Sequence, residues 1–282
     1  MLFRSFHTLV LHMNEGHAAF CALERTRMHC EEYGVSFAEA LEITRAGGCF
    51  TTHTPVPAGN EIFTIALMRR FFSRYRQSLG ITEAELLALG QQEDSSEEDG
   101  FSMTVLGLRT SSFRNGVSSL HGEVAREMWQ DLWAKSLVSE VPIRGLTNGV
   151  HASTWVAKEM SDLYARYIDV RWIDRSGDAS MWTSVYDIPD GELWKVHEER
   201  RRLMVERIRD GVRIKMPHHI AEAERQSAHE LLHPHVLTIG FARRFATYKR
   251  SDLLFRNIER LIRILQHAER PVQIVIAGKA HP

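Results

Sequence analysis

The residues most able to do chemistry are four cationic side chains at a predicted strand-to-helix junction: Arg243, Arg244, Lys249 and Arg250. The preceding run 236–239 is apolar and β-branched, as in a short buried strand. Thr247 is a candidate helix N-cap, which would place Lys249 and Arg250 in the first helical turn. Basic residues there oppose the positive end of the helix dipole, so a bound anion explains them better than helix stability does. A solvated basic loop is the alternative, and the spacing alone does not decide between the two.

Polar clusters also follow predicted strand ends in the first half of the chain. Asn14-Glu15-Gly16-His17 follows a predicted strand at 8–13, and His53 follows another at 49–52, where Pro55 and Pro57 stiffen the exit. Enzymes with alternating strands and helices usually build their sites at strand ends. Turn chemistry with a satisfied histidine is the commoner interpretation of any one such cluster alone.

Two further turn-like segments could contact a ligand. Asn115-Gly116 is a predicted turn, and the small residues after it leave room for a ligand to approach the backbone. In Thr147-Asn148-Gly149 the asparagine amide can bond a polyol. Trp155, taken alone, is more typical of a core than of a cofactor contact.

One segment suggests a different chemistry. Residues 229–233 read His-Glu-Leu-Leu-His, the H-E-x-x-H spacing of zinc hydrolases. Pro234 follows at once, so the supporting helix cannot continue, and no third ligand motif follows. We therefore assign no metal and keep a zinc hydrolase as a minor alternative. The acidic stretch 91–100 is predicted to be a solvated loop.

Composition restricts the class of protein. The 282 residues are 44% hydrophobic and 25% charged, with a formal net charge of -1, which argues against nucleic-acid or membrane-surface binding by the chain as a whole. No apolar run is long enough to span a bilayer. Cys21, Cys30 and Cys49 lack CxxC spacing and suggest reduced thiols. The default prediction is a cytoplasmic protein.

The elements that must position these residues alternate between strands and helices. Helices are predicted at 18–33, 61–79, from the 115–121 segment to residue 133, and at 192–215, and a strand at 101–108. In the 61–79 helix, Ile62 is expected to face inward. A strand at 236–239, a helix to about residue 266 and a strand at 271–277 form a βαβ unit, so the chain is α/β with a parallel sheet. Two parallel strands cannot bury both faces, so we expect the domain that they start to be incomplete.

Six motifs, in order along nearly the whole chain, resemble those of the α-glucan phosphorylases, which act on glycogen, starch or maltodextrin. The resemblance is strongest to the shorter bacterial and archaeal type. The matching segments are HMNEGHAAF at 12–20, TTHTPVPAGN at 51–60, NGVSSLHGEV at 115–124, TNGVHASTW at 147–155, GFARRFATYKR at 240–250 and IAGK at 276–279.

The resemblance implies a GT-B type architecture with two Rossmann-like domains, both incomplete in this chain. Residues 1–150 would be the C-terminal part of the first, glucan-side domain, and 151–235 a helical connection. Residues 236–282 would be the first βαβ unit of the second domain, on the cofactor and phosphate side. The full-length enzyme would be a homo-oligomer.

The resemblance also implies a reaction and its residues. A glycosyltransferase of this family transfers a terminal α-1,4-glucosyl unit to orthophosphate, giving glucose 1-phosphate, with pyridoxal 5′-phosphate as cofactor. By motif match, Arg244 and Lys249 would grip the substrate phosphate. Arg243 would lie near the cofactor phosphate, and Trp155 near the cofactor. The predicted sugar-site residues are His17, His53, Asn115 and Asn148.

Two departures from the family pattern limit this expectation. Ser112 stands where many members carry histidine. The segment with the Schiff-base lysine would lie beyond residue 282, and none of the six lysines stands in that motif's context: Lys135, Lys158, Lys195, Lys215, Lys249 and Lys279. We therefore expect an internal fragment that does not bind the cofactor covalently and is inactive alone. A non-catalytic module binding glucan or phosphate is the alternative.

Overall fold

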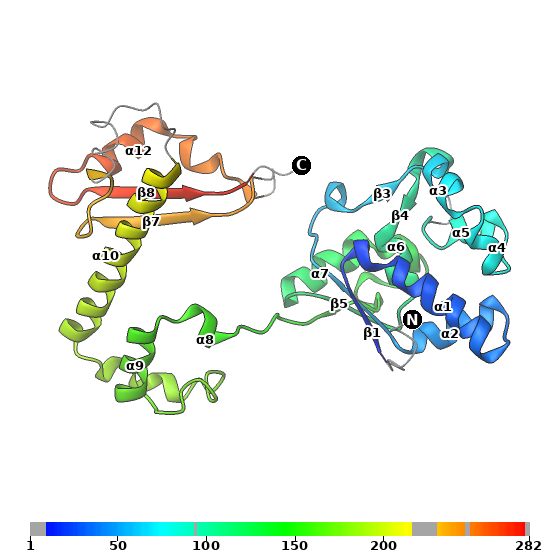
Figure 1. Ribbon diagram of the computed structural model, residues 1–282, viewed down its shortest axis with the longest axis horizontal. Helices are drawn as coiled ribbons and strands as arrows, with labels where there is room; N and C mark the ends of the chain where they lie inside the picture. The colour runs from blue at the N-terminus through cyan, green and yellow to red at the C-terminus, as the bar shows by residue number, and fades with distance from the viewer. Residues whose placement is uncertain (1–9, 93–94, 216–229, 246–248, 280–282) are drawn as a thin grey trace. The chain divides into compact units, whose positions relative to one another are not determined.

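The computed structural model describes residues 10–92, 95–215, 230–245 and 249–279. The chain divides into two compact units, residues 1–149 (unit 1) and 150–282 (unit 2). Figure 1 shows the course of the chain through each unit.

Unit 1 is organised around a parallel sheet of four strands in the order β1-β2-β5-β6. The strands are β1 (Leu11–Asn14), β2 (Gly48–Thr52), β5 (Phe113–Gly116) and β6 (Arg144–Gly145). Asn14 pairs with Thr51, Thr51 with Asn115, and Asn115 with Arg144, so one row of residues crosses the sheet near its carboxyl edge. The predicted parallel α/β arrangement is confirmed. All four strands end at the same edge, which is where the polar clusters begin.

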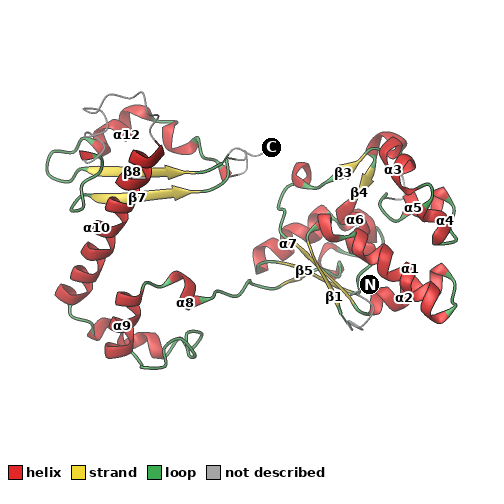
Figure 2. Cartoon of the chain, viewed as in Figure 1, coloured by secondary structure: helices red, strands yellow, loops and turns green. Residues whose placement is uncertain are grey.

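Helices cover this sheet (Figure 2), and they supply most of the unit's core. Those nearest the sheet are α1 (Phe20–Tyr33), α2 (Phe37–Ala46), α6 (Met103–Arg109) and α7 (Ser119–Met128). Helix α2 begins in a capping box, in which the Ser36 side chain accepts from the backbone of Glu39 and the Glu39 carboxylate accepts from that of Ser36. Leu23, Phe50 and Leu106 are fully buried between these elements.

The prediction of a strand at 101–108 is wrong. Only β4 (Phe101–Ser102) is extended, paired antiparallel with β3 (Ile62–Phe63), and helix α6 begins directly after it. The side-chain oxygen of Ser102 caps α6 by accepting from Val105 N–H. Every residue from Met103 to Leu108 is buried, so the helix has no polar face. A uniformly apolar run carries no periodicity to distinguish helix from strand.

The predicted 61–79 helix is also divided. After β3 come α3 (Ile65–Phe72) and α4 (Tyr75–Ser78), then α5 (Glu83–Ala88). The Thr64 hydroxyl caps α3 by accepting from Leu67 N–H, so the helix begins after the short strand. Ile62, which we expected to face inward, is 55% exposed.

The helix predicted to reach residue 133 is shorter than expected. Asn115 lies in β5 and not in a turn, and α7 begins only at Ser119 and ends at Met128. A 3-10 turn, Gln130–Trp133, follows it. The buried positions of α7 are His121, Gly122 and Ala125, while Leu120 is 70% exposed.

Unit 2 contains the predicted βαβ unit. Strands β7 (Leu237–Ala242) and β8 (Val272–Ala277) are parallel, and α12 (Ile258–Leu265) lies between them in sequence. The first strand is longer than predicted, because Gly240 pairs with Val275 within the ladder and does not end it.

The connection before this sheet is helical. It consists of α8 (Ala152–Trp155), α9 (Lys158–Tyr167) and α10 (Asp190–Lys215), and the last confirms the predicted long helix. Trp172, 2% exposed, packs edge-on against Tyr164 and Trp182 to form the centre of this part. No helix among the described residues is long and apolar enough to cross a membrane.

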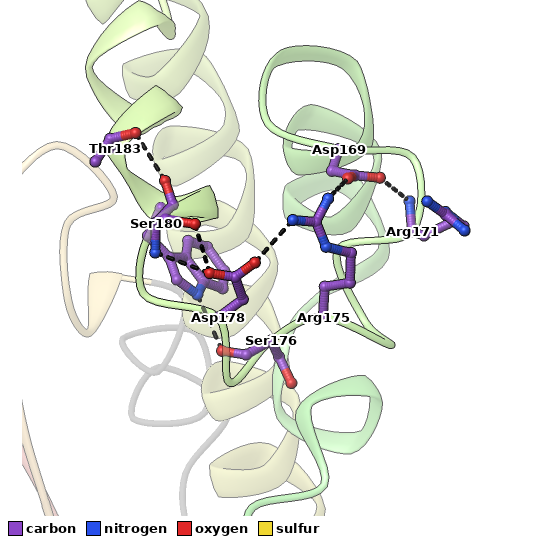
Figure 3. Close-up of polar contacts among 8 residues, drawn as sticks. Asp169, Arg171, Arg175, Ser176, Asp178, Ser180 and Thr183 are labelled. Carbon is purple, nitrogen blue, oxygen red and sulfur yellow. Dashed lines mark hydrogen bonds and ion pairs between the residues drawn. The ribbon is translucent and has the colours of Figure 1, made fainter.

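A polar network holds the loop between α9 and α10 (Figure 3). Arg175 bridges the carboxylates of Asp169 at 2.5 Å and Asp178 at 2.7 Å. Asp178 also accepts from the backbone N–H and the hydroxyl of Ser180. The Ser180 hydroxyl and then the Arg175 guanidinium lower the pKa of Asp178 to about 2. The loop is therefore fixed by hydrogen bonds and charge in addition to the Trp172 cluster.

Candidate functional site

The carboxyl edge of the unit 1 sheet brings together residues that are far apart in the sequence. His53 directly follows β2, and its Nε2–H donates to Oδ1 of Asn14, the last residue of β1, at 2.5 Å. Glu15 is the first residue after β1, and its carboxylate accepts a hydrogen bond from the backbone N–H of His53 at 2.7 Å. The predicted strand-end histidine is thus held by both residues of the Asn14-Glu15 pair.

A second chain of hydrogen bonds crosses the row of paired residues. His12 donates through Nε2 to the Thr51 hydroxyl at 2.8 Å, and that hydroxyl donates to Oδ1 of Asn115 at 2.9 Å. The Asn115 amide nitrogen donates to the carbonyl of Gly116 at 3.3 Å. Both polar ends of the Asn115 side chain therefore already have protein partners. Thr51 is 5% exposed, so this chain stiffens the sheet beneath the strand ends.

Asn148 and His17 are both exposed. In the sequence, Asn148 comes shortly after β6 and His17 shortly after β1, two strands of the same sheet. The backbone N–H of Asn148 donates to the carbonyl of Val117 at 3.3 Å, which ties the segment after β6 to the segment after β5. His17 lies in the 3-10 turn Gly16–Ala18 that follows β1. Their side chains are accessible to a ligand, and no hydrogen bond joins them to one another among the described contacts.

His121 is a residue of this edge that sequence reasoning did not single out. Its Nδ1 accepts the backbone N–H of Val117 at 3.1 Å, and the residue is 8% exposed. A Cβ on Gly116 would lie 2.7 Å from that Nδ1, so only glycine fits beside the ring. A Cβ on Gly122 would likewise lie 2.7 Å from the Cα of Gly145. In the sequence, the glycines at positions 116 and 122 are the feature that indicates this close packing.

The basic junction of unit 2 differs from the prediction. Helix α12 begins at Ile258, with the Asn257 side chain as its N-cap, so Lys249 and Arg250 do not lie in its first turn. Thr247, the predicted cap, is outside the described residues. A 3-10 turn, Leu253–Phe255, occupies part of the segment that we predicted to be helical. Lys249 and Arg250 therefore do not oppose the dipole of α12, whose effect is confined to its first turn.

The cations themselves remain accessible. Arg243 and Arg244 are exposed just after β7, and the backbone N–H of Arg243 donates to the carbonyl of Ala277 on β8 at 3.1 Å. Lys249 is half-buried, and Arg250 has a left-handed backbone, with φ of 50°. A Cβ on Gly278 would lie 2.3 Å from the Arg243 carbonyl, so a glycine is needed where the two strand ends meet. Paired strand ends thus fix the backbone of Arg243 while its guanidinium is solvated.

Four of the six lysines lie in surroundings that do not suit covalently held pyridoxal phosphate. An imine-forming lysine needs a desolvated, easily deprotonated amine. Lys135, Lys195 and Lys279 are exposed, and Lys158 pairs with Asp162 at 2.6 Å, which raises the pKa of the lysine. None of these four lysines therefore lies in the desolvated environment that a covalent imine needs.

The zinc hypothesis loses its supporting helix. His229 lies outside the described residues, and the segment after it turns: Leu232 has a positive φ of 61°. The two histidines would need a continuous helical turn between them to face one metal. Within the described part of the chain, no group of three or more His, Cys, Asp or Glu side chains is placed to hold a metal ion.

A cavity of about 540 Å³ lies elsewhere in unit 1, and the sequence did not indicate it. It is bordered by the predicted acidic loop and by the end of α7, with Asn60, Gln92, Asp99, Trp129 and Asp131 in its wall. None of the predicted site residues lines it.

Comparison with known proteins identifies the family. The model of the carbohydrate phosphorylases matches residues 3–282. The chain is 42% identical over 276 residues to a maltodextrin phosphorylase of Thermococcus litoralis, covering 97% of this chain and 31% of that protein. It is 38% identical over 280 residues to a glycogen phosphorylase of Mycobacterium tuberculosis, covering 97% and 32%. A glycogen phosphorylase of Aquifex aeolicus is 37% identical over 273 residues, covering 96% and 39%.

The chain therefore spans between about three and four tenths of the length of these relatives. The resemblance drawn from the six motifs is confirmed. Because the family model extends over almost every residue, this chain belongs to the carbohydrate phosphorylase family.

Proposed function

We propose that the chain serves in α-glucan phosphorolysis, the transfer of a terminal α-1,4-glucosyl unit of glycogen, starch or maltodextrin to orthophosphate, with glucose 1-phosphate as product. The observation that carries the proposal is the extent of the family match, residues 3–282, which includes both the strand-end residues and the basic junction. The relatives named as maltodextrin and glycogen phosphorylases support the choice of substrate class.

We extend the proposal to the architecture. Residues 1–150 would be part of the first Rossmann-like domain of a GT-B fold, 151–235 a helical connection, and 236–282 the start of the second such domain. The parallel order β1-β2-β5-β6 and the parallel pair β7-β8 support this assignment.

The proposed phosphate contacts are Arg244 and Lys249. Phosphate oxygens are best bound by fixed cations, and arginine can hold two of them at once. The exposed Arg244 follows a strand whose end is held by pairing to β8, so its backbone is preorganised. Arg243 and Trp155 are the proposed contacts of pyridoxal 5′-phosphate, and both are exposed and thus approachable.

The proposed sugar contacts are His53, Asn148, Asn115 and His17. Their imidazole and amide groups can donate to or accept from sugar hydroxyls. His53 has the best-defined position, because its ring and its backbone are both hydrogen-bonded. Asn115 already has one partner at each polar end, and its amide keeps a second N–H and a second lone pair with which to bond a sugar hydroxyl.

The experiment is a chimera in which this chain replaces the matching segment of the Thermococcus litoralis maltodextrin phosphorylase. We expect glucose 1-phosphate to form from maltoheptaose and phosphate. Arg244→Ala should lower kcat by about 100-fold or more, as for loss of one preorganised group that stabilises charge. Arg256→Ala is the matched control, since this exposed arginine pairs only with Asp252 among the described contacts and should leave the rate unchanged.

A folded, cofactor-loaded chimera that forms no glucose 1-phosphate would contradict the proposal. Calorimetry on the 282-residue chain addresses the non-catalytic alternative. Maltoheptaose binding that survives loss of both Arg244 and Lys249, together with an inactive chimera, would favour a binding module.

A further inference from the structure

The carboxylate of Glu15 joins the exit of β1 to three consecutive residues at the exit of β2. Oε2 accepts the backbone N–H of His53 at 2.7 Å and the hydroxyl of Thr54 at 3.2 Å. Oε1 accepts the hydroxyl of Thr52 at 3.5 Å, the longest of the three contacts. The backbone N–H of Glu15 donates to the Thr51 carbonyl at 2.9 Å, which continues the β1–β2 pairing by one residue. One side chain thus spans the turn by which the chain leaves β2.

The backbone of Glu15 is in a conformation that favours glycine. Its φ is 76° and its ψ is 167°, a region that residues with a Cβ rarely adopt. The next residue is Gly16, yet the strained position carries a long charged side chain. Such strain persists only where the surroundings impose it, and it gathers at functional sites. Here the three hydrogen bonds that the carboxylate accepts explain why a glutamate occupies this strained position.

The same dipeptide fixes both halves of His53. Glu15 holds its backbone N–H, and Asn14 Oδ1 accepts from its ring Nε2–H. With the proton on Nε2, Nδ1 of the neutral ring is left as an acceptor. His53 is exposed, so packing does not orient it, and these hydrogen bonds do.

We propose that Glu15 is the positioning residue of the strand-end site: its carboxylate sets the backbone course of the 52–54 turn and thereby the ring orientation of His53. The relevance to sugar binding rests on the proposed function, in which His53 contacts the glucosyl unit. The clamp itself does not depend on that function. A carboxylate is required because it accepts several donors at once without presenting a donor of its own.

The first test uses NMR on the 282-residue chain, with His53 assigned through His53→Gln. In Glu15→Gln we expect exchange of the His53 amide proton to accelerate by about 10- to 100-fold, as for loss of a hydrogen bond to a charged group. The ring ¹⁵N shifts of His53 should move toward a mixture of tautomers. Glu15→Asp, which keeps the charge, should restore part of the protection. Glu31→Gln, an exposed glutamate of α1 paired with Arg27, is the matched control and should change neither signal.

Two results would overturn the proposal. One is an unchanged His53 amide and ring in Glu15→Gln. The other is acceleration of exchange to the same degree in α1 and β5, which would make Glu15 a general stabiliser. Glu15→Gly relieves the strained backbone, so it should fold even if Glu15→Gln does not, and we expect it to release the His53 amide as well.

A second test places Glu15→Gln in the chimera described above. We expect KM for maltoheptaose to rise by about 10-fold with a smaller change in KM for phosphate, because the clamp orients a sugar contact. An inactive parent chimera would count against the proposed function alone, since the NMR test still decides the clamp. An active chimera whose KM for maltoheptaose is unchanged by the substitution would overturn the role of the clamp in the site.

Discussion

Both units contain parallel strands joined through a helix, but the two sheets differ in how well they are covered. In unit 1, Phe50 of β2 is completely buried. In unit 2, Ile239 of β7 is 48% exposed and Ile276 of β8 is 44% exposed. Poor strand pairing does not explain this exposure, because all six residues of β7 pair with residues of β8. The comparison shows that parallel register needs only two matching apolar runs, whereas burial needs helices on the faces of the sheet.

The cover of unit 1 depends on close packing of helix against strand. The ring of Phe50 lies against Gly107 of α6, so closely that a Cβ there would be 2.3 Å from a ring carbon. In unit 2, Leu261 is the one residue of α12 that is buried, and the described part owes its order elsewhere to the Trp172 cluster and the Arg175 network. In unit 1 the packing of helices on the sheet dominates, whereas unit 2 combines an aromatic cluster with a polar network away from its sheet.

The largest expected effect tests this difference in cover directly. Phe50→Ala should destabilise unit 1 by about 3–5 kcal/mol, because it removes a buried ring and leaves a cavity. Ile276→Ala, the matched change in a half-exposed strand residue, should destabilise unit 2 by about 1 kcal/mol or less. Hydrogen exchange in increasing urea, read separately on peptides from each unit, measures both. Equal losses would mean that the two sheets are equally buried in solution.

Two helix glycines should respond with opposite signs. Gly107→Ala should cost about 1–3 kcal/mol through overpacking against Phe50, more than the gain in helix propensity. At Gly211 in α10 no atom of the described residues lies within 4 Å of an added Cβ, so Gly211→Ala should stabilise its helix by about 0.5–1 kcal/mol. Urea midpoints of the two units provide the measurement. Stabilisation by Gly107→Ala would refute the close packing of α6 on β2.

The smallest effect concerns the polar network of unit 2. The pKa of Asp178 is lowered from 3.8 to about 2, so its stabilising contribution is complete above pH 3.8 and disappears as the pH falls through about 2. Asp178→Asn should remove this dependence and raise hydrogen exchange in the 176–183 loop already at neutral pH. Asp162→Asn, which breaks a pair within α9, is the control and should leave that loop unchanged. A loop whose exchange is the same in wild type and Asp178→Asn would show that the Trp172 cluster alone orders it.

Elements with clear patterns were predictable, and those without one were not. The apolar runs of β2, β7 and β8 and the amphipathic α10 were correctly recognised, because each has the length and periodicity of its type. Helix α6 was mistaken for a strand because burial on every side removes the periodic signal. The sequence predicts too early a start for α12, because Thr247 is a plausible cap, whereas the helix is capped by Asn257, ten residues later.

The position of the proposed site residues after strand ends was predictable from the sequence, but the way they are held together was not. His53, Asn148 and the Asn14-to-His17 cluster stand out because polar residues after apolar runs mark strand ends. The clamp by Glu15 depends on β1 and β2 being neighbours in register, and on a positive φ that the residue type argues against. Neither is a property of the local sequence.

The sequence by itself determined the family, through six motifs in order, and the alternation of strands and helices, because both are written in residue types and their spacing. Only the tertiary structure decided which residues meet. It packs Phe50 against Gly107 and His121 against Gly116. It also makes the Glu15 carboxylate the acceptor for three donors at the end of β2. The reason is physical: two of the donors that Glu15 binds lie 38 and 39 positions away in the sequence, and the approach of two strands or of a helix and a strand is set by the packing of the whole unit.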